Sequence, residues 1–173
     1  MRKIEKILPP KRDYGGAVHK KRRKSKRPFD ANQALHVTMR SARATGLWSF
    51  QHRRNKGTIH LLVLDTAERY GIKIHRWENV FNHLHFLIEA ANREDLKAFL
   101  RVLPQRIMFA VTGARKGSPK GRFFDQIAWS RIVNWGWDFE AVLDYLWKNT
   151  LESLGCSRLE VKIMTRNAKL APF

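Results

Sequence analysis

The alternation of apolar and polar residues along the chain predicts four strands. The first is Ala34–Arg40, in which every second side chain is apolar. Residues 72–77 and 82–89 alternate in the same way and are separated by a short turn, which favours a hairpin. A fourth strand is expected around residues 128–133.

Apolar residues at helical spacing predict three helices. The first spans residues 58–70, and the second runs from residue 96 to about 113, with a kink or break expected at Pro104. The last is expected to begin with Asp138 as its N-cap and to reach about residue 154. Its inward stripe consists of Phe139, Val142, Leu143, Leu146, Thr150 and Leu154.

The predicted order of elements is strand, helix, strand, strand, helix, strand, helix. This order is typical of an α+β fold with a ferredoxin-like antiparallel sheet, helices on one face and an added C-terminal helix. At 173 residues the chain has the length of one domain. We expect a flexible basic arm at residues 1–30, a globular domain at residues 31–155 and a tail of unassigned role at residues 156–173.

Positive charge dominates the composition and points to a partner. The chain has 34 Lys and Arg residues against 15 Asp and Glu residues, a formal charge of +19. Residues 1–28 hold +10 of this excess. A polyanion is therefore the expected partner, and the basic run at residues 19–28 is expected to be disordered until it contacts phosphates. A solvated tail or a localisation-type signal is the alternative for this run.

The sequence indicates neither a membrane protein nor a protein stabilised by disulfides. No apolar run approaches the roughly 20 residues that span a bilayer, and the N-terminal residues lack the apolar stretch of a signal peptide. We therefore expect a soluble, cytoplasmic protein. The single cysteine, Cys156, excludes an intrachain disulfide and a multi-cysteine zinc site.

Two histidines share one face of the strand expected at residues 82–89. Alternation places His83 and His85 on the face opposite the apolar residues between and after them. Residues two apart on a strand are separated by roughly 6.5–7 Å, so both rings can converge on one metal ion. The pair is half of a metal site that needs a further ligand. Two simply hydrogen-bonded histidines are the alternative.

Tyr145 and Asn149 lie one turn apart on the flank of the last helix. A phenol is the least basic hydroxyl nucleophile among side chains, with a pKa near 10, and can attack a phosphate that is suitably polarised. An amide oxygen can complete a metal site with two imidazoles. A half-buried packing tyrosine is the alternative.

These residues, in this order and spacing, resemble the single-tyrosine HUH transposases of the insertion-sequence 200 type and their relatives associated with repetitive extragenic palindromes. HVTMR (36–40) resembles the first strand of that family, LVLDTAERYGIKIHRW (62–77) its helix and second strand, and FNHLHFLIE (81–89) the segment usually written PNHVHLLI. GRFFDQIAWSRIV (121–133) resembles its later glycine-led segment, and DYLWKNTLESLG (144–155) its tyrosine helix, often written YIxxNPVxAGL.

The resemblance covers roughly residues 34–155 and implies a role for each candidate. His83 and His85 would be the metal-binding histidines, Asn149 the third metal ligand and Tyr145 the nucleophile. The implied cofactor is a divalent cation, Mg²⁺ or Mn²⁺. The implied activity is cleavage and transfer of single-stranded DNA beside a hairpin, through a 5′-phosphotyrosine and a free 3′-hydroxyl.

Two positions depart from the family pattern, because Phe81 and Thr150 stand where proline is common. The implied protein is a monomer or homodimer that associates with the nucleoid, and is either a transposase or a domesticated enzyme that processes palindromic repeats. Two other functions stay open. One is a non-catalytic nucleic-acid-binding module with structural histidines, and the other is a replication or conjugation nickase.

Candidate DNA contacts follow from this reading. Trp129, Trp135 and Trp137 could stack on bases, with core packing an equal interpretation. The candidate phosphate contacts are Lys20, Lys21, Arg22, Arg23, Lys24, Arg40, Arg53, Arg54, Lys56, Arg115, Lys116, Lys120 and Arg122.

Overall fold

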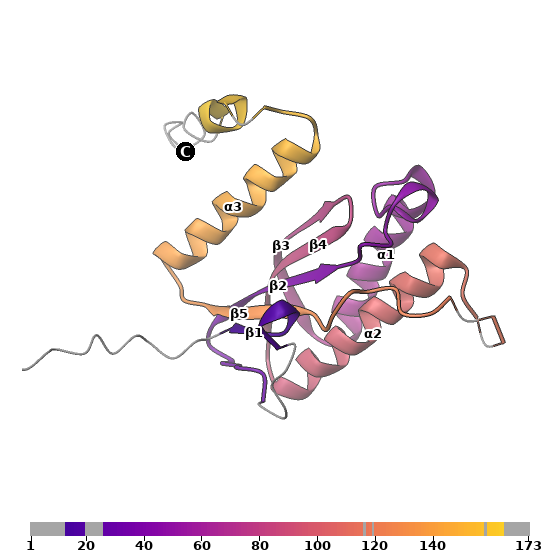
Figure 1. Ribbon diagram of the computed structural model, residues 1–173. Helices are drawn as coiled ribbons and strands as arrows, with labels where there is room; N and C mark the ends of the chain where they lie inside the picture. Colours follow the sequence, from indigo (N-terminus) through magenta and orange to yellow (C-terminus); the bar gives the residue numbers. More distant parts are fainter. Residues whose placement is uncertain (1–12, 20–25, 116, 119, 158, 165–173) are drawn as a thin grey trace, which may run out of the picture.

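The computed structural model describes residues 13–19, 26–115, 117–118, 120–157 and 159–164. It is an α+β fold built on a five-stranded antiparallel sheet with the order β1-β5-β2-β4-β3 (Figure 1). The strands are β1 Asp13–Tyr14, β2 Ala34–Arg40, β3 Ile72–Val80, β4 His83–Ala90 and β5 Trp129–Val133. The helices are α1 Arg53–Arg69, α2 Arg93–Thr112 and α3 Trp137–Ser153, with short 3-10 turns at Gly16–His19 and Gly46–Trp48.

The sheet separates two hydrophobic cores. Leu84, Phe86 and Ile88 of β4 point into the larger core, which α1 and α2 cover. Leu87 of β4 points the other way, into a small cluster with Val142 and Leu146 of α3. Figure 1 shows α3 on the opposite side of the sheet from α1 and α2. The period-2 alternation of β4 therefore divides its side chains between the two cores.

The four predicted strands and the predicted hairpin are confirmed. β2 has the predicted bounds, and β3 and β4 pair from Ile72↔Ala90 to Val80↔His83. β3 extends three residues beyond the prediction, because Glu78, Asn79 and Val80 continue the pairing although they break the apolar alternation. Phe81 forms the turn with a positive φ of 49°. The turn thus uses a conformation that a proline at this position could not adopt.

The three predicted helices are confirmed with corrections. α1 begins at Arg53, earlier than predicted, because the side chain of His52 accepts a hydrogen bond from the Arg54 N–H and caps the first turn. The break expected at Pro104 is wrong, since α2 runs through it to Gly113, which ends the helix at φ 66°. The buried side chains on either side of Pro104 hold both halves against the core.

The start of α3 also differs from the prediction. Gly136, not Asp138, is the N-cap residue, and it makes no side-chain cap hydrogen bond. The Asp138 carboxylate instead pairs with Arg131 of β5 through two hydrogen bonds of 2.9 and 3.0 Å and accepts a third from the Asn134 N–H. Leu154, predicted on the inward stripe, is 73% exposed because it lies beyond the end of the helix.

Part of the predicted arm belongs to the sheet. Asp13 and Tyr14 form β1, which pairs with Arg131 and Ser130 of β5. Gly15 follows at φ 85°, and a Cβ there would lie 2.2 Å from the Ala128 carbonyl oxygen, so only glycine fits. Residues 1–12 and 20–25 lie outside the described residues. In the predicted tail, residues 159–164 are helical.

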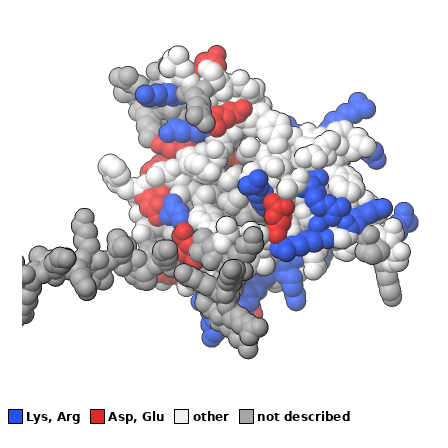
Figure 2. All heavy atoms as spheres, in the orientation of Figure 1, with Lys and Arg blue, Asp and Glu red and all other residues white. Residues whose placement is uncertain are grey.

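Charged side chains are unevenly distributed over the surface. Figure 2 shows Lys and Arg gathered on the side where Figure 1 places the start of α1 and the loop after α2, while Asp and Glu lie towards α3. Within the described part of the chain, no helix has the length and apolar character needed to cross a bilayer.

Candidate functional site

A pocket of about 730 Å³ lies between the sheet and α3. Its floor is the face of β2, β4 and β5 that points away from α1 and α2, and α3 forms one wall. The segment that leads into β5 closes another side. The polar and aromatic residues around it are His36, Thr38, Arg40, His83, His85, Asp125, Gln126, Trp129, Arg131 and Tyr145.

The two predicted histidines both line this pocket. Their rings are nearly parallel, with an interplanar angle of 15° and centroids 5.9 Å apart. A hydrogen bond of 3.1 Å joins Nδ1 of His85 to the Thr38 hydroxyl, the residue paired with it on β2. When Nδ1–H donates to Thr38, the lone pair of Nε2 is left for another partner. The shared face predicted for the histidines is confirmed.

Tyr145 reaches the same pocket from α3. Its ring centroid lies 5.8 Å from that of His85 and 5.8 Å from that of His36, and both contacts are edge-to-face. Val142 and Leu146, one on each side of it in the sequence, are buried against the sheet. This packing holds the phenol over the imidazoles while leaving it 46% exposed. A group in the pocket can therefore reach the hydroxyl.

His36 is a third histidine of the site, which the sequence did not single out. It lies on β2, stacks on His85 with centroids 5.8 Å apart, and contacts the edge of Trp129 at 5.3 Å. Its Nε2 is buried and has no hydrogen-bond partner within the described residues. Only the pairing register of β2 with β4, which the sequence does not reveal, brings it beside His85.

All three histidines are shifted towards the neutral form. Burial, followed by the nearby His85, lowers the pKa of His36 to about 3, and burial with the nearby His83 lowers the pKa of His85 to about 4. Burial and Arg40 lower the pKa of His83, against an opposing effect of Asp125. Neutral imidazoles can use a ring nitrogen to accept a proton or bind a cation.

Two arginines line the pocket, and each lies beside an aspartate. Arg131 lines it while paired with Asp138, which ties β5 to the first turn of α3. Arg40 lies at the end of β2, with its Nε 3.6 Å from a carboxylate oxygen of Asp125. Its side chain is 60% exposed, so it can contact a phosphate at the mouth of the pocket.

Asn149 is not among the residues that line this pocket. It lies one turn beyond Tyr145, half-buried, and its amide nitrogen is buried without a hydrogen-bond partner in the described part of the chain. The described residues contain no group of three or more His, Cys, Asp or Glu side chains that could hold a metal ion.

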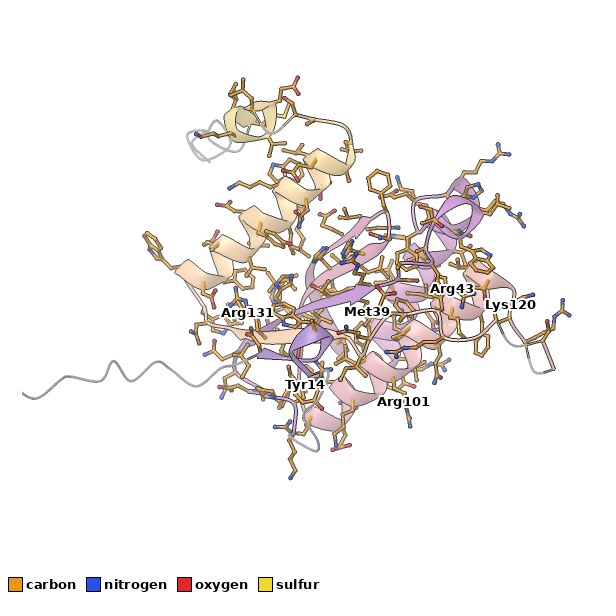
Figure 3. All side chains as sticks on the ribbon, viewed as in Figure 1. Tyr14, Met39, Arg43, Arg101, Lys120 and Arg131 are labelled. Carbon is orange, nitrogen blue, oxygen red and sulfur yellow. The ribbon has the colours of Figure 1, made fainter. Side chains whose placement is uncertain are left out.

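The candidate phosphate contacts fall into separate places. Arg53 and Lys56 lie on the first turns of α1 and line a hollow beside Trp77, with Arg54 exposed between them. Arg115, Lys120 and Arg122 are exposed in the loop after α2, where the Arg43 side chain binds the carbonyl oxygens of Lys120 and Arg122 (Figure 3). Lys20, Lys21, Arg22, Arg23, Lys24 and Lys116 lie outside the described residues.

The stacking candidates also differ from one another. Trp137 is 95% exposed at the start of α3, Trp135 is 45% exposed, and Trp129 is half-buried against His36. Packing accounts for Trp129, and Trp137 remains available for stacking on a base.

Comparison with known proteins adds no family to this description. No protein-family model matches the chain, and no curated protein matches it by sequence. The function must therefore be argued from the pocket itself.

Proposed function

We propose that the chain cuts and rejoins single-stranded DNA beside a hairpin, with Tyr145 as the nucleophile, on a ferredoxin-like scaffold formed by β2 to β5, α1 and α2. The observation that carries the proposal is the position of the Tyr145 ring, 5.8 Å from the rings of both His36 and His85 in an open pocket. A packing tyrosine needs no such pocket. A nucleophile needs one, together with polar groups around the attacked atom.

The reaction begins when the phenolic proton of Tyr145, whose side chain is 46% exposed, passes to water, and water later supplies the proton that the leaving 3′-oxygen takes up. The Tyr145 oxygen then forms a bond to the scissile phosphorus, and the bond from phosphorus to the 3′-oxygen breaks. That oxygen takes up a proton to become a free 3′-hydroxyl, and the 5′-phosphate stays on the tyrosine. Attack by a 3′-hydroxyl on this phosphotyrosine reverses the exchange, so strands are rejoined without an external energy source.

The residues of the pocket fit the needs of such a step. Arg40 and Arg131 supply positive charge beside the attacked phosphate. His83, His85 and the amide oxygen of Asn149 would hold a divalent cation, which requires the Asn149 side chain to turn towards a pocket that it does not line in this structure. When bound, the cation polarises the phosphate and offsets its developing charge. Burial lowers the pKa of both histidines, which favours the neutral imidazole with one unprotonated ring nitrogen that can bind a cation.

The charge of the molecule suits a nucleic-acid substrate. The net charge of +19 and the basic side chains around the start of α1 and the loop after α2 (Figure 2) favour a phosphate backbone. Exposed Trp137 and the half-buried Trp77 beside Arg53 add surfaces for unstacked bases. This combination is typical of single-strand binding rather than of binding to a small anion.

The test is covalent attachment. A labelled single-stranded hairpin oligonucleotide incubated with the protein and Mg²⁺ or Mn²⁺ is expected to give a protein–DNA adduct that survives denaturing electrophoresis. Tyr145→Phe should abolish the adduct while DNA binding persists. Tyr70→Phe is the matched control, because Tyr70 packs at the edge of the main core away from the pocket and should attach DNA as wild type does.

Two experimental outcomes would contradict the proposed function. Equal attachment by the Tyr145→Phe protein would exclude this nucleophile. Tight DNA binding without an adduct under any metal condition would favour the alternative of a nucleic-acid-binding module, for which the basic surface alone suffices.

A further inference from the structure

A second pocket, of about 830 Å³, lies on the other face of the sheet, beside the β1–β5 edge and α2. Tyr14 of β1 faces it because it pairs with Ser130, which in turn pairs with Val37 of the main core. Met39 of β2 lies at its floor. Figure 3 labels Tyr14, Met39 and Arg101, which come from β1, β2 and α2 around this pocket.

The walls of this pocket combine apolar and cationic side chains. Its apolar surface comes from methionine, leucine, proline and phenylalanine residues of β2, α2 and the segment before β5, with Tyr14 at one side. Among the described residues that line it, Glu94 alone is acidic, and it already pairs with Lys97 at 2.7 Å. Against it stand six cationic lining residues: Lys26, Arg27, Arg93, Lys97, Arg101 and Arg122.

Arg27 shows that this excess of positive charge extends into the protein. Its guanidinium is largely buried over the ring of Tyr14, with its carbon 4.6 Å from the ring centroid, and it donates to the Ala128 carbonyl oxygen at 2.8 Å and to the Ser130 hydroxyl. No ion pair of Arg27 is found among the described residues. An anion in the pocket would supply the missing counter-charge for a buried cation.

The side chains that line the second pocket indicate which kind of ligand it binds. A planar apolar group fits among Phe124, Met108 and Tyr14, and an attached anion meets Arg101, Lys97 and Arg122 at the rim. A nucleotide has both parts, since its base is flat and its phosphate is charged. A simple anion would leave the apolar surface unused, and an apolar ligand would leave the cations without a partner.

One short segment forms the partition between the two pockets. Gln126 and Ile127 line both of them, so the pockets lie on opposite sides of the residues that lead into β5. Ile127 is half-exposed, and the side-chain oxygen of Gln126 is buried without a hydrogen-bond partner in the described part of the chain. A single strand that passes over the exposed Ile127 side chain can therefore enter both pockets.

We infer that this second pocket binds an unpaired nucleotide of the same DNA strand that Tyr145 attacks, with the base on the apolar floor and the phosphate on Arg101 and Arg122. The inference rests on the proposed function for the identity of the strand, and on the pocket alone for the chemistry of the ligand. It assigns Lys97 and Arg101, which the sequence did not single out, to substrate recognition.

Photo-crosslinking tests where the base lies. Single-stranded oligonucleotides that carry 5-iodouracil at one position after another are bound to the wild-type protein in EDTA, irradiated and mapped by mass spectrometry. At one register, we expect cross-links on peptides that contain Tyr14, Met108 or Phe124. Cross-links confined to other parts of the chain at every register would overturn the inference.

Charge reversal tests the phosphate contact. By fluorescence anisotropy with the same oligonucleotide, Arg101→Glu should weaken binding about ten-fold. Arg69→Glu is the matched control, because it makes the same change of charge on an exposed residue near the end of α1 that lines none of these pockets, and it should weaken binding much less. Equal losses in both variants would overturn the inference.

Failure of this inference and failure of the proposed function can be told apart, because the binding measurements require neither metal nor cleavage. Cross-links in the second pocket without any Tyr145 adduct would overturn the proposed function and leave a nucleotide site. Adduct formation without cross-links in the second pocket would overturn the inference and leave the nucleophile.

Discussion

The ring of Tyr145 stands edge-on to the ring of His85, with centroids 5.8 Å apart and planes at 81°. The two residues come from α3 and β4, which meet on the face of the sheet away from α1 and α2. The relationship exists only while α3 is packed on that face. The chemistry proposed for the pocket therefore depends on a small apolar contact as much as on the polar residues themselves.

Removal of one imidazole should abolish metal-dependent attachment. His83→Ala is preferred to His85→Ala as the first test, because His83 is half-buried and its loss disturbs packing less. We expect adduct formation to fall by more than about 100-fold, because loss of a group that only orients a metal ligand already costs about 10–100-fold. Calorimetric titration with Mn²⁺ should show the loss of a binding site.

The control for this experiment is His60→Ala. His60 is an exposed histidine of α1 that stacks on Trp77, and it does not line the Tyr145 pocket. It should retain metal binding, and it should retain attachment at saturating DNA, the condition needed because His60 lines the hollow beside Trp77. Normal attachment by the His83→Ala protein would count against a metal site at this pair.

Acid should destabilise the protein in a defined pH window. The folded pKa values of His36 and His85, about 3 and about 4, lie below the ordinary value of 6.5, so the unfolded chain binds protons first. Their contribution to stability is complete above about pH 6.5 and is lost as the pH falls towards 3. Each histidine adds a slope of up to about 1.4 kcal/mol per pH unit within that range.

The variant His36→Leu isolates this effect. It removes one titrating group and a buried nitrogen without a partner, so it should unfold less readily than wild type at pH 5 and show a shallower pH dependence. Urea unfolding at pH 7.5, 6 and 5 measures the slope. An unchanged slope would show that His36 is not held in its neutral form.

Loss of a buried leucine should have different effects in the two cores. Leu146 and Leu103 are both fully buried, the first in the small cluster under α3 and the second in the core under α1 and α2. Leu→Ala costs about 2–5 kcal/mol at such positions. Leu103→Ala should lower the stability of the whole domain, whereas Leu146→Ala should chiefly release α3.

Hydrogen exchange measured by mass spectrometry distinguishes these outcomes. In the Leu146→Ala protein, amides of α3 should lose protection while those of β2 and β4 keep it. Uniform loss of protection in both variants would mean that the two cores unfold as one unit.

A glycine at the sheet edge should resist substitution. Gly15→Ala places a methyl group 2.2 Å from the Ala128 carbonyl oxygen, so β1 must move away from β5. Gly46→Ala is the matched control, since Gly46 also has a positive φ but no atom within 4 Å of the added methyl group. We expect the control to cost about 1 kcal/mol for its backbone conformation, and Gly15→Ala to cost more in thermal unfolding.

Much of the fold follows from local pattern. The strands and helices arise from alternation and helical spacing, and those signals placed β2, the hairpin and α1 to α3 correctly in the chain. β1 was not predicted, because two residues in a basic segment show no apolar periodicity. Their pairing with Arg131 and Ser130 is a tertiary contact. A kink or break was expected at Pro104 because a local rule ignores the burial of its neighbours, and the helix is not broken there.

The site was predictable only in part. The shared face of His83 and His85 is a property of one strand, and so the sequence contained it. The partnership of His36 and Thr38 with His85 depends on strand register, and the contact of Tyr145 with both imidazoles depends on how α3 lies across the sheet. Such relations join distant segments, and no local pattern encodes them.

The outer edge of the sheet at β3 bears on how the protein behaves in concentrated solution. β3 is irregular between Ile74 and Arg76, where its register with β4 shifts, and it displays Lys73 and Arg76 along its length. An irregular, positively charged edge is a poor template for a strand from another molecule. We therefore expect this edge to resist pairing with a strand of another molecule when the protein is concentrated.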